Sequence, residues 1–411
     1  SPKPTPTPQP GFTIEAKTTD LLQFDTIRLS AQGAKADAKL SWVINGKEVG
    51  EGKDYAFTQP RVGRYQVSLV DKTSGEKVSK DFSVTARFTS GAFLLNEGNF
   101  GNETGTLTYI DASKQFVLDS AYIRVNGMKL GNVCQDMTFA NGKVYIISQN
   151  GPKNGGEGLL TIADAKTLEK HKVINDAALA KDWPTHIAVV HSRIYLRGNS
   201  GIYRGTEEGS FKLIPGTEKA NKLRMVTIGE LVIATTSTNK LLVIQDEEVK
   251  QTFTLLEGSP SGLALAPDGQ LWLSYSKPNT LAKVSVSASG VKILDKHTTT
   301  QSLDKQWTAT SAIFARANQI FFTEQSSVIY RHDFSTGETK EIVDVQKVDK
   351  QAKMYYNSLG IDPKTGHIYY ASFGDYSTYK QNVTLVLDHD GKVLLKREHV
   401  NAFPAGFYFI P

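Results

Sequence analysis

The feature that most constrains this chain is an internal repeat that begins near residue 136 and continues to the C-terminus. Each copy has the same plan: a strand of small and aliphatic residues, a short turn, and a strand of aromatic or β-branched residues, as in GLALAPDGQLWL. Six copies begin at Asp136, His186, Leu223, Gly262, Ala312 and Leu359, and a truncated seventh, AGFYFIP, begins at Ala405. Successive starts lie 37 to 50 residues apart, which is the spacing of four-stranded propeller blades.

The incomplete last copy predicts how the two ends of this region meet. It supplies one strand, whereas residues 91–122 (GAFLLNEGN, GTLTYIDAS and QFVLDSAY) supply three strands and lack the innermost one. Joining both ends in one sheet closes the ring and removes exposed sheet edges. The sequence therefore predicts an all-β, seven-bladed β-propeller over residues 89–411, closed by a C-terminal strand.

The N-terminal part follows a different pattern. Residues 1–11, SPKPTPTPQPG, alternate proline with polar residues and predict an extended linker. Residues 12–88 contain short alternating strands, with Asn45-Gly46 as a hairpin turn and with Trp42 and Val67 as core residues. This pattern predicts an immunoglobulin-like (Ig-like) β-sandwich. The segments WVINGKEVG and GRYQVSLVD resemble a polycystic-kidney-disease-type (PKD) Ig module, which implies a spacer in an exported protein.

Composition excludes several classes of function. No stretch approaches the roughly 18 to 20 apolar residues of a membrane-spanning helix. The 47 Lys and Arg residues are interspersed with 42 Asp and Glu residues, so the formal charge of +5 forms no basic stripe for nucleic acid. Cys134 is the only cysteine, which excludes an intrachain disulfide and a cysteine-rich metal site.

Loop lengths predict which face of the propeller is functional. The connections between the first and second strands and between the third and fourth strands of each blade lie on one face, where turns such as Asn141-Gly142 are minimal. The other face receives the long loops 96–105 (NEGNFGNETG), 148–158 and 372–382, together with long inter-blade segments. Binding sites concentrate in long irregular loops on rigid scaffolds, so we expect the site on this face.

Aromatic and polar side chains on this face are the candidate ligand-binding residues. Aromatic rings offer flat surfaces to a ligand, or alternatively fill gaps between blades. The aromatic candidates are Phe100, Trp183, Tyr275, Trp307, Tyr355, Tyr356, Phe373, Tyr376 and Tyr379. A polar ring at the starts of the inner strands either binds the ligand or bonds to neighbouring backbone. Its members are Gln135, Asp136, Thr185, His186, Ser261, Ser311 and Ser358. Charges in these loops nearly balance, so the ligand is expected to be polar and near neutral, with apolar faces.

Catalysis, in the form of a propeller hydrolase of lactonase type, is the first alternative. Asp136 and His186 occupy equivalent positions in consecutive blades and could form an acid–base pair. No nucleophile elbow, phosphate-binding loop or zinc-protease motif occurs in a supporting context. The eight His residues are scattered, and the loops lack the acidic spacing of a calcium site. We therefore assign no catalytic residue, metal or cofactor, and favour binding over catalysis.

Two segments resemble a known family: LLNEGNFGNETGTLTYID, residues 94–111, and NGMKLGNVCQDMTFANGKVYIISQN, residues 126–150. The family comprises exported seven-bladed propellers of Bacteroidetes, often lipoproteins, related to YncE-type propellers and to a domain family of unknown function. Members often occur beside TonB-dependent transporters, and one branch captures cobalamin at the cell surface. The resemblance implicates Asn96, Glu97, Gly98, Asn99, Leu130, Gly131, Gln135 and Asp136, either as hallmarks of the fold or as binding residues.

Together with the proline-rich linker, the resemblance implies an exported protein of the outer membrane, exposed at the cell surface and tethered only by a lipid anchor upstream of Ser1. Its predicted role is to capture a small-molecule or glycan nutrient, cobalamin or another corrinoid among them, for a TonB-dependent transporter. The N-terminal Ig-like module departs from the cobalamin-capturing branch, so a glycan or another large nutrient stays open as the ligand. A scaffold that binds only protein is the second alternative.

Overall fold

The computed structural model describes residues 2–4, 11–305, 310–355, 357–401 and 403–411. The chain divides into two compact units, Ser1–Thr89 and Ser90–Pro411. The predicted start of the propeller, residue 89, lies one residue before the second unit. Each unit is described separately below.

The first unit consists of two sheets that share one core. The three-stranded sheet has the order β1–β3–β6, with β1 Thr13–Glu15, β3 Ile27–Gln32 and β6 Asp54–Phe57. The five-stranded sheet has the order β2–β8–β7–β4–β5, with β2 Asp20–Leu22, β8 Lys77–Thr85, β7 Gly63–Asp71, β4 Leu40–Ile44 and β5 Lys47–Glu51. Trp42 and Val67 are fully buried as predicted, and Phe57 of one sheet packs on Phe82 of the other with 4.9 Å between ring centroids.

The second unit is built from four-stranded antiparallel sheets, and its described residues form seven of them. The sheet that joins the two ends of the unit contains β36 Pro404–Phe409, β9 Ala92–Asn96, β10 Thr106–Asp111 and β11 Phe116–Leu118. The next two sheets contain β12 Cys134–Ala140, β13 Lys143–Ser148, β14 Leu160–Asp164 and β15 Lys170–Ile174, then β16 His186–Val190, β17 Arg193–Gly198, β18 Gly201–Thr206 and β19 Gly209–Leu213.

The remaining four sheets have the same meander order. Two of them contain β20 Val226–Ile228, β21 Leu231–Thr235, β22 Lys240–Gln245 and β23 Glu248–Thr254, then β24 Ser259–Leu265, β25 Leu271–Ser276, β26 Thr280–Ser287 and β27 Gly290–Thr298. The last two contain β28 Phe314–Arg316, β29 Gln319–Phe322, β30 Val328–Asp333 and β31 Glu338–Asp344, then β32 Leu359–Ile361, β33 Ile368–Phe373, β34 Gln381–Leu387 and β35 Val393–Val400.

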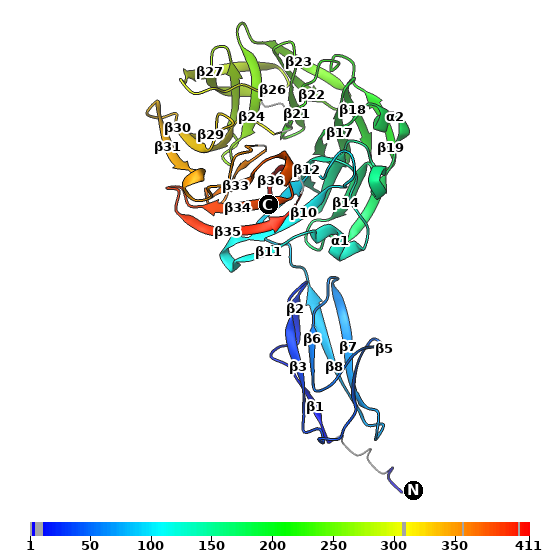
Figure 1. Cartoon of the computed structure of the whole chain (residues 1–411). Coiled ribbons are helices and arrows are strands. Elements are labelled where there is room, and N and C mark those ends of the chain that lie inside the picture. Colours follow the sequence, from blue (N-terminus) through cyan, green and yellow to red (C-terminus); the bar gives the residue numbers. More distant parts are fainter. Residues whose placement is uncertain (1, 5–10, 306–309, 356, 402) are drawn as a thin grey trace. The chain divides into compact units, whose positions relative to one another are not determined.

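The innermost strands form a closed ring around a centre (Figure 1). Strands β12, β16, β20, β24, β28, β32 and β36 contact one another in this order, and β36 also contacts β12. Strand β36 pairs antiparallel with β9, with Phe407 opposite Leu94. The predicted closure by the C-terminal strand is therefore confirmed. Apolar residues of adjacent sheets pack together, as Tyr145 and Ile162 of one sheet do with Leu196 of the next.

The connections between strands differ in length on the two faces of the ring. On one face, which we call the short-turn face, the longest connection is 362–367 between β32 and β33. On the opposite face, called the loop-rich face below, residues 97–105, 119–133, 149–159, 299–313 and 345–358 connect consecutive strands. The predicted asymmetry is therefore present.

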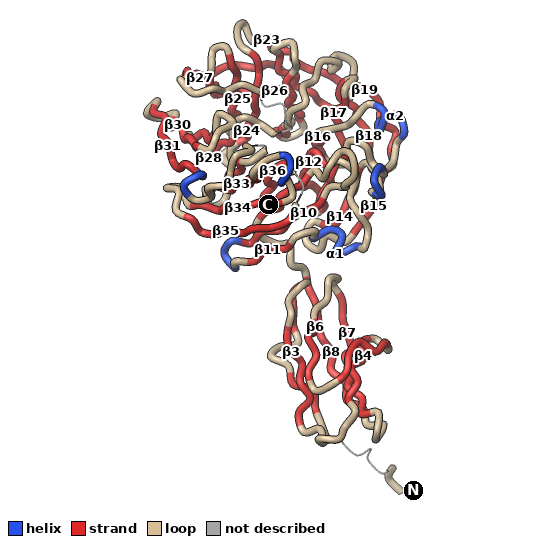
Figure 2. The backbone as a smooth tube through the Cα atoms, viewed as in Figure 1, coloured by secondary structure: helices blue, strands red, loops and turns tan. Residues whose placement is uncertain are grey.

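Two short helices lie in the inter-sheet segments of the loop-rich face, α1 Ala121–Asn126 and α2 Ala177–Lys181 (Figure 2). The sequence analysis did not anticipate them. Helix α2 begins where the Asp176 carboxylate accepts hydrogen bonds from the backbone of Ala178 and Leu179, which satisfies two otherwise unpaired N–H groups. Among the described residues, no helix is long and apolar enough to cross a bilayer.

Candidate functional site

The first long loop, residues 97–105, is held by the neighbouring sheet. The Asn132 side chain donates to the backbone carbonyls of Asn99 and Glu103, at 3.0 and 2.6 Å. The Gly105 amide donates to the Gly131 carbonyl at 2.9 Å. On the other side of the loop, the Glu103 carboxylate lies 2.8 Å from the Lys380 ammonium group. These bonds leave the tip of the loop fixed and projecting.

Phe100 at this tip forms one aromatic wall with Trp183. The two rings meet edge to face, with 5.9 Å between centroids. Phe100 is 46% exposed and Trp183 is 43% exposed, so both rings keep a free surface. The Lys153 ammonium group lies 3.7 Å from the centre of the Phe100 ring, a cation–π contact. Two predicted residues from different sheets are thus brought together.

A second aromatic wall is formed by the segment before β36 and by the segment between β33 and β34. Phe403, which precedes β36, contacts Tyr376 with 6.0 Å between centroids and stacks on Tyr379 at 4.6 Å. Tyr376 is 53% exposed, whereas Phe373 is buried and meets Phe403 edge to face. Tyr379 also donates its hydroxyl hydrogen to the Glu103 carboxylate at 3.0 Å. The wall is therefore linked to the first loop.

The two walls border a hollow of about 280 Å³, called the central hollow below. Its lining consists of Glu97, Gly98, Phe100, Val133, Gln135, Gln149, Trp183, Lys222, Tyr376 and Phe403. Four of these residues, Phe100, Gln135, Trp183 and Tyr376, were predicted to bind ligand. Gln135 is only 2% exposed, and its Oε1 atom has no hydrogen-bond partner among the described residues. A buried acceptor without a donor is costly, so this atom favours a hydrogen-bond donor that enters the hollow.

The lining of the central hollow contains one basic and one acidic side chain, Lys222 and Glu97. Burial lowers the pKa of Lys222, and the nearby Arg197 charge lowers it further, whereas the Glu97 carboxylate opposes the shift. Burial also lowers the pKa of Lys305, as do the charges of Lys222 and Arg197. The pKa of Arg197 falls to about 10, mainly through burial. The charge balance predicted for the long loops did not include Arg197 and Lys222. Arg197 lies on strand β17, and Lys222 lies in a segment that was not counted among the long loops.

In the polar ring at the starts of the inner strands, Asp136 joins neighbouring sheets, whereas the Ser261 hydroxyl bonds to Ser274 of its own sheet. The Asp136 carboxylate accepts from the Tyr408 hydroxyl at 2.6 Å and from the Ile187 amide at 3.0 Å, which ties β12 to β36 and to β16. Burial raises the pKa of Asp136, although the nearby Arg224 charge opposes the shift. His186 is fully buried, and its Nδ1 atom lies 2.8 Å from the Thr185 hydroxyl. Neither Asp136 nor His186 borders the central hollow, so these two predicted residues are not part of this candidate site.

The other four aromatic candidates have different outcomes. Tyr275 is 2% exposed and packs in the core of its sheet, so its assignment as a ligand-binding residue is wrong. Its ring lies where a Cβ atom on Gly258 would come within 2.4 Å, which shows how closely it is enclosed. Tyr355 packs against the core around β33, and its hydroxyl is bonded to Gln346 and Ala352. Trp307 and Tyr356 lie outside the described residues.

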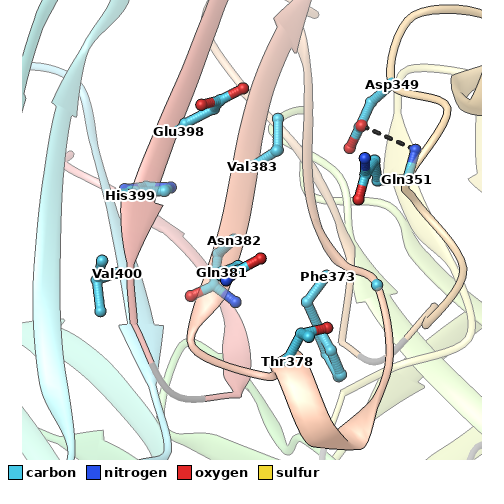
Figure 3. Close-up of a pocket in the computed structure, with 11 residues that line it drawn as sticks. Asp349, Gln351, Phe373, Thr378, Gln381, Asn382, Val383, Glu398, His399 and Val400 are labelled. Carbon is cyan, nitrogen blue, oxygen red and sulfur yellow. Dashed lines mark hydrogen bonds between the residues drawn. The ribbon is translucent and has the colours of Figure 1, made fainter.

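A second, larger hollow of about 460 Å³ lies beside β34 and β35 and is called the peripheral hollow below (Figure 3). Its lining consists of Asp349, Gln351, Phe373, Gly374, Thr378, Gln381, Asn382, Val383, Glu398, His399 and Val400. Phe373 is the only predicted residue here. The central hollow is the better candidate despite its smaller volume, because four predicted side chains from separate segments meet there.

The peripheral hollow contains an arrangement that resembles a catalytic triad. His399 lies 3.0 Å from the Asp119 carboxylate through Nδ1 and 2.7 Å from the Thr384 hydroxyl through Nε2. Thr384 is fully buried inside the sheet and does not line the hollow. A nucleophile must reach the substrate, so this geometry gives no support to covalent catalysis. Within the described residues, no group of three or more His, Cys, Asp or Glu side chains could hold a metal ion.

Sequence reasoning also missed Gln149 and Phe403, which line the central hollow. Phe403 immediately precedes the innermost strand β36, and Gln135 lies at the start of the equivalent strand β12. Because Gln135 was identified by this position in the repeat, the same position could have identified Phe403. Gln149 follows β13 within a loop that was identified as long. Neither residue carries a motif of its own.

The fold and the site together define an all-β, propeller-like protein with an aromatic-walled hollow on its loop-rich face. The chain belongs to the family described as Domain of unknown function (DUF5074), whose model matches residues 90–410. Residues 7–79 match a second model, the Penicillin-Binding Protein C-terminus Family. No curated protein matches the chain in sequence.

Two solved structures show the likeness in fold. A quinonprotein alcohol dehydrogenase-like protein from Bacteroides thetaiotaomicron has 16% sequence identity and a TM-score of 0.64, over 97% of this chain and 99% of that one. A protein from Lactobacillus plantarum has 10% identity and a TM-score of 0.52, over 78% of this chain and 100% of that one. At such low identity the likeness concerns the fold alone.

Proposed function

We propose that this chain is a non-catalytic ligand-binding protein, and that its ligand enters the central hollow of the loop-rich face. The observation that carries the proposal is the meeting of Phe100, Gln135, Trp183 and Tyr376, from four separate segments, around one cavity. Exposed aromatic rings over a buried polar floor suit a ligand with apolar faces and hydrogen-bonding groups. A volume of about 280 Å³ fits part of a large ligand.

The finer architecture is part of the same proposal. The seven four-stranded sheets are the blades of a seven-bladed propeller, and the two sheets of the first unit are an Ig-like module that serves as a spacer. The family resemblance of residues 94–111 and 126–150 supports a place at the outer-membrane surface of the cell, with a lipid anchor upstream of Ser1. It also supports capture of cobalamin, another corrinoid or a glycan for a TonB-dependent transporter.

Exposed apolar side chains on the loop-rich face support the transporter part of the proposal. Phe100, Met128, Trp183, Leu256, Tyr376 and Val400 are all more than a third exposed. Apolar side chains gathered on one face favour association with another surface. A membrane transporter that accepts the captured ligand would dock against this face.

The test is a thermal-shift screen with cobalamin, corrinoid precursors and oligosaccharides. A ligand that binds the folded state raises the melting temperature by mass action. For the compound that does so, Trp183→Ala should weaken binding by about tenfold or more, since an aromatic anchor contributes roughly 2 kcal/mol. Leu256→Ala is the matched control, because Leu256 is exposed on the same face and does not line either hollow. Equal affinity in both variants would place the site elsewhere.

The alternatives predict different results. A hydrolase of lactonase type should turn over a lactone or ester, and Asp136→Asn should abolish that turnover. A protein-only scaffold should retain a membrane partner without any small-molecule response. The burial of Asp136 and Thr384 away from open surface favours binding over hydrolysis.

A further inference from the structure

One basic side chain, Lys222, lines the central hollow, and Arg197 is bonded to the segment that carries it. Arg197 is near the end of β17, and Lys222 lies between β19 and β20. Arg197 donates to the Ala220 carbonyl, two residues before Lys222, which brings its guanidinium group to the Lys222 segment. Burial lowers the pKa of Lys222, and the Arg197 charge lowers it further, whereas the Glu97 carboxylate opposes the shift.

Arg197 is fixed in place by neutral groups. It is 8% exposed, and its guanidinium group donates to the Ala220 carbonyl and to the Thr185 hydroxyl, both at 3.1 Å. The charge of the Asp182 carboxylate raises the pKa of Arg197, against the effect of burial. Within the described part of the chain, the side chains that donate to Asp182 are the Ser200 and Tyr203 hydroxyls, and not Arg197. Across the described residues, neither Arg197 nor Lys222 forms an ion pair with a carboxylate. A buried cation without such a partner is unfavourable and attracts an anion.

The polar side chains in the lining of the central hollow, Gln135, Lys222 and Glu97, limit which chemical groups a ligand can place there. Gln135 presents an unpartnered acceptor, Oε1, from a buried position in the lining. The Lys222 ammonium group offers donors only. Glu97, the carboxylate in the lining, lies close enough to Lys222 to act on its charge. The ligand group that satisfies this floor therefore carries a negative charge for Lys222 and an adjacent hydrogen-bond donor for Gln135.

We propose that the central hollow recognises an anionic group, a carboxylate or a phosphate, which binds at Lys222 with the Arg197 charge nearby. A neighbouring hydroxyl or amide of the ligand donates to Gln135 Oε1. The apolar part of the ligand lies between the Phe100–Trp183 wall and the Tyr376–Phe403 wall. This inference rests on the proposed function and replaces the near-neutral ligand that the loop charges predicted.

The test uses three probes of similar shape: 2-naphthoate, 2-naphthyl phosphate and the neutral 2-naphthamide. Their affinities for the full chain are measured by isothermal titration calorimetry at low salt. At least one of the two anions should bind about tenfold more tightly than the amide, because hydrogen bonds to a charged group are about twice as strong as neutral ones. The preferred anion identifies carboxylate or phosphate as the recognised group. Its affinity should fall as sodium chloride is added.

Lys222→Met should weaken binding of the preferred anion, so that the anion no longer binds more tightly than the amide. Lys114→Met is the matched control, since Lys114 is exposed on the short-turn face and should keep the preference. Circular dichroism melts of both variants show that they are folded. If the amide binds as tightly as both anions, or if Lys222→Met keeps the preference, the inference is wrong.

The two proposals fail in distinguishable ways. If all three probes bind equally and Trp183→Ala weakens them all, the hollow is a ligand site without charge selection, so the proposed function stands and this inference falls. If Trp183→Ala changes no affinity, the placement of the site itself is wrong. Binding of none of the probes at millimolar concentration would overturn this inference, while the screen with corrinoids and oligosaccharides would still decide the proposed function.

Discussion

The side-chain amide of Asn132 donates to the backbone carbonyl of Asn99 at 3.0 Å, and so joins the second sheet of the propeller-like unit to the loop of the first. The same amide donates to Glu103, and its oxygen accepts from Asn150. One buried side chain therefore organises two long loops. The position of Phe100, which lies between Asn99 and Glu103, depends on these bonds.

Asn132→Ala should therefore loosen the loop that carries Phe100. The substitution leaves two backbone carbonyls without their donor, and we expect the free energy of unfolding to fall by about 1 to 3 kcal/mol. Ligand affinity at the central hollow should fall as well, since Phe100 loses its fixed position. Chemical denaturation measures the first effect. Asn318→Ala is the control, because Asn318 makes an exposed bond to Ser335, and we expect a change within about 0.5 kcal/mol.

Gly131→Ala tests whether this family hallmark is structural. A Cβ atom at residue 131 would lie 2.0 Å from the Ser148 hydroxyl and 2.4 Å from the Gly158 carbonyl. Overpacking of this kind costs about 1 to 3 kcal/mol, so the melting temperature should drop. Gly290→Ala is the matched control, since a Cβ there meets nothing within 4 Å. A variant at residue 131 that melts like the parent would contradict the close approach.

The periodic strands made much of the fold predictable. Which loop side chains are buried could not be predicted in the same way. The AGFYFIP segment could be placed in the first sheet because residues 91–122 lacked one strand. Tyr275 and Tyr376 look alike in sequence, yet one is enclosed beside Gly258 and the other is exposed. That difference depends on contacts between distant segments.

The approach of Arg197 to the Lys222 segment was hidden for a similar reason. Arg197 belongs to a strand, and strand side chains alternate between faces, so its approach to Lys222 depends on the twist and register of two neighbouring sheets. The short helix α2 was in principle predictable, because Asp176 precedes the helix-favouring run AALAK as a capping residue.

Lys222→Met should stabilise the ligand-free protein at neutral pH. The pKa of Lys222 is lowered in the folded state, mainly by burial, so the folded state binds its proton less tightly than the unfolded state does. The charged Lys222 therefore lowers the free energy of unfolding. This destabilisation is complete at pH values below the pKa of Lys222 in the folded state, and it disappears as the pH rises above the unfolded-state pKa of about 10.4. The melting temperature of the variant should exceed that of the parent at pH 7, and the difference should shrink in alkaline buffer. A lower melting temperature at pH 7 would contradict the unfavourable charge.

The pair of His297 and His332 should make the protein sensitive to acid. His297 Nδ1 lies 2.7 Å from His332 Nε2, and the buried His332 also bonds to the Thr339 hydroxyl through Nδ1. Burial lowers the pKa of His332, and the charge of His297 lowers it further, so the unfolded state binds the proton more tightly.

Stability contributed by neutral His332 should therefore be present above the unfolded pKa of about 6.5 and be lost as the pH falls through the folded value. Thermal melts between about pH 5 and pH 7.5 should show a melting temperature that rises with pH, and His332→Gln should reduce that slope even if it lowers stability throughout. His389→Gln, which alters an exposed ring paired with Asp390, should leave the slope unchanged. An identical slope in the parent and in His332→Gln would show that His332 does not cause the loss of stability in acid.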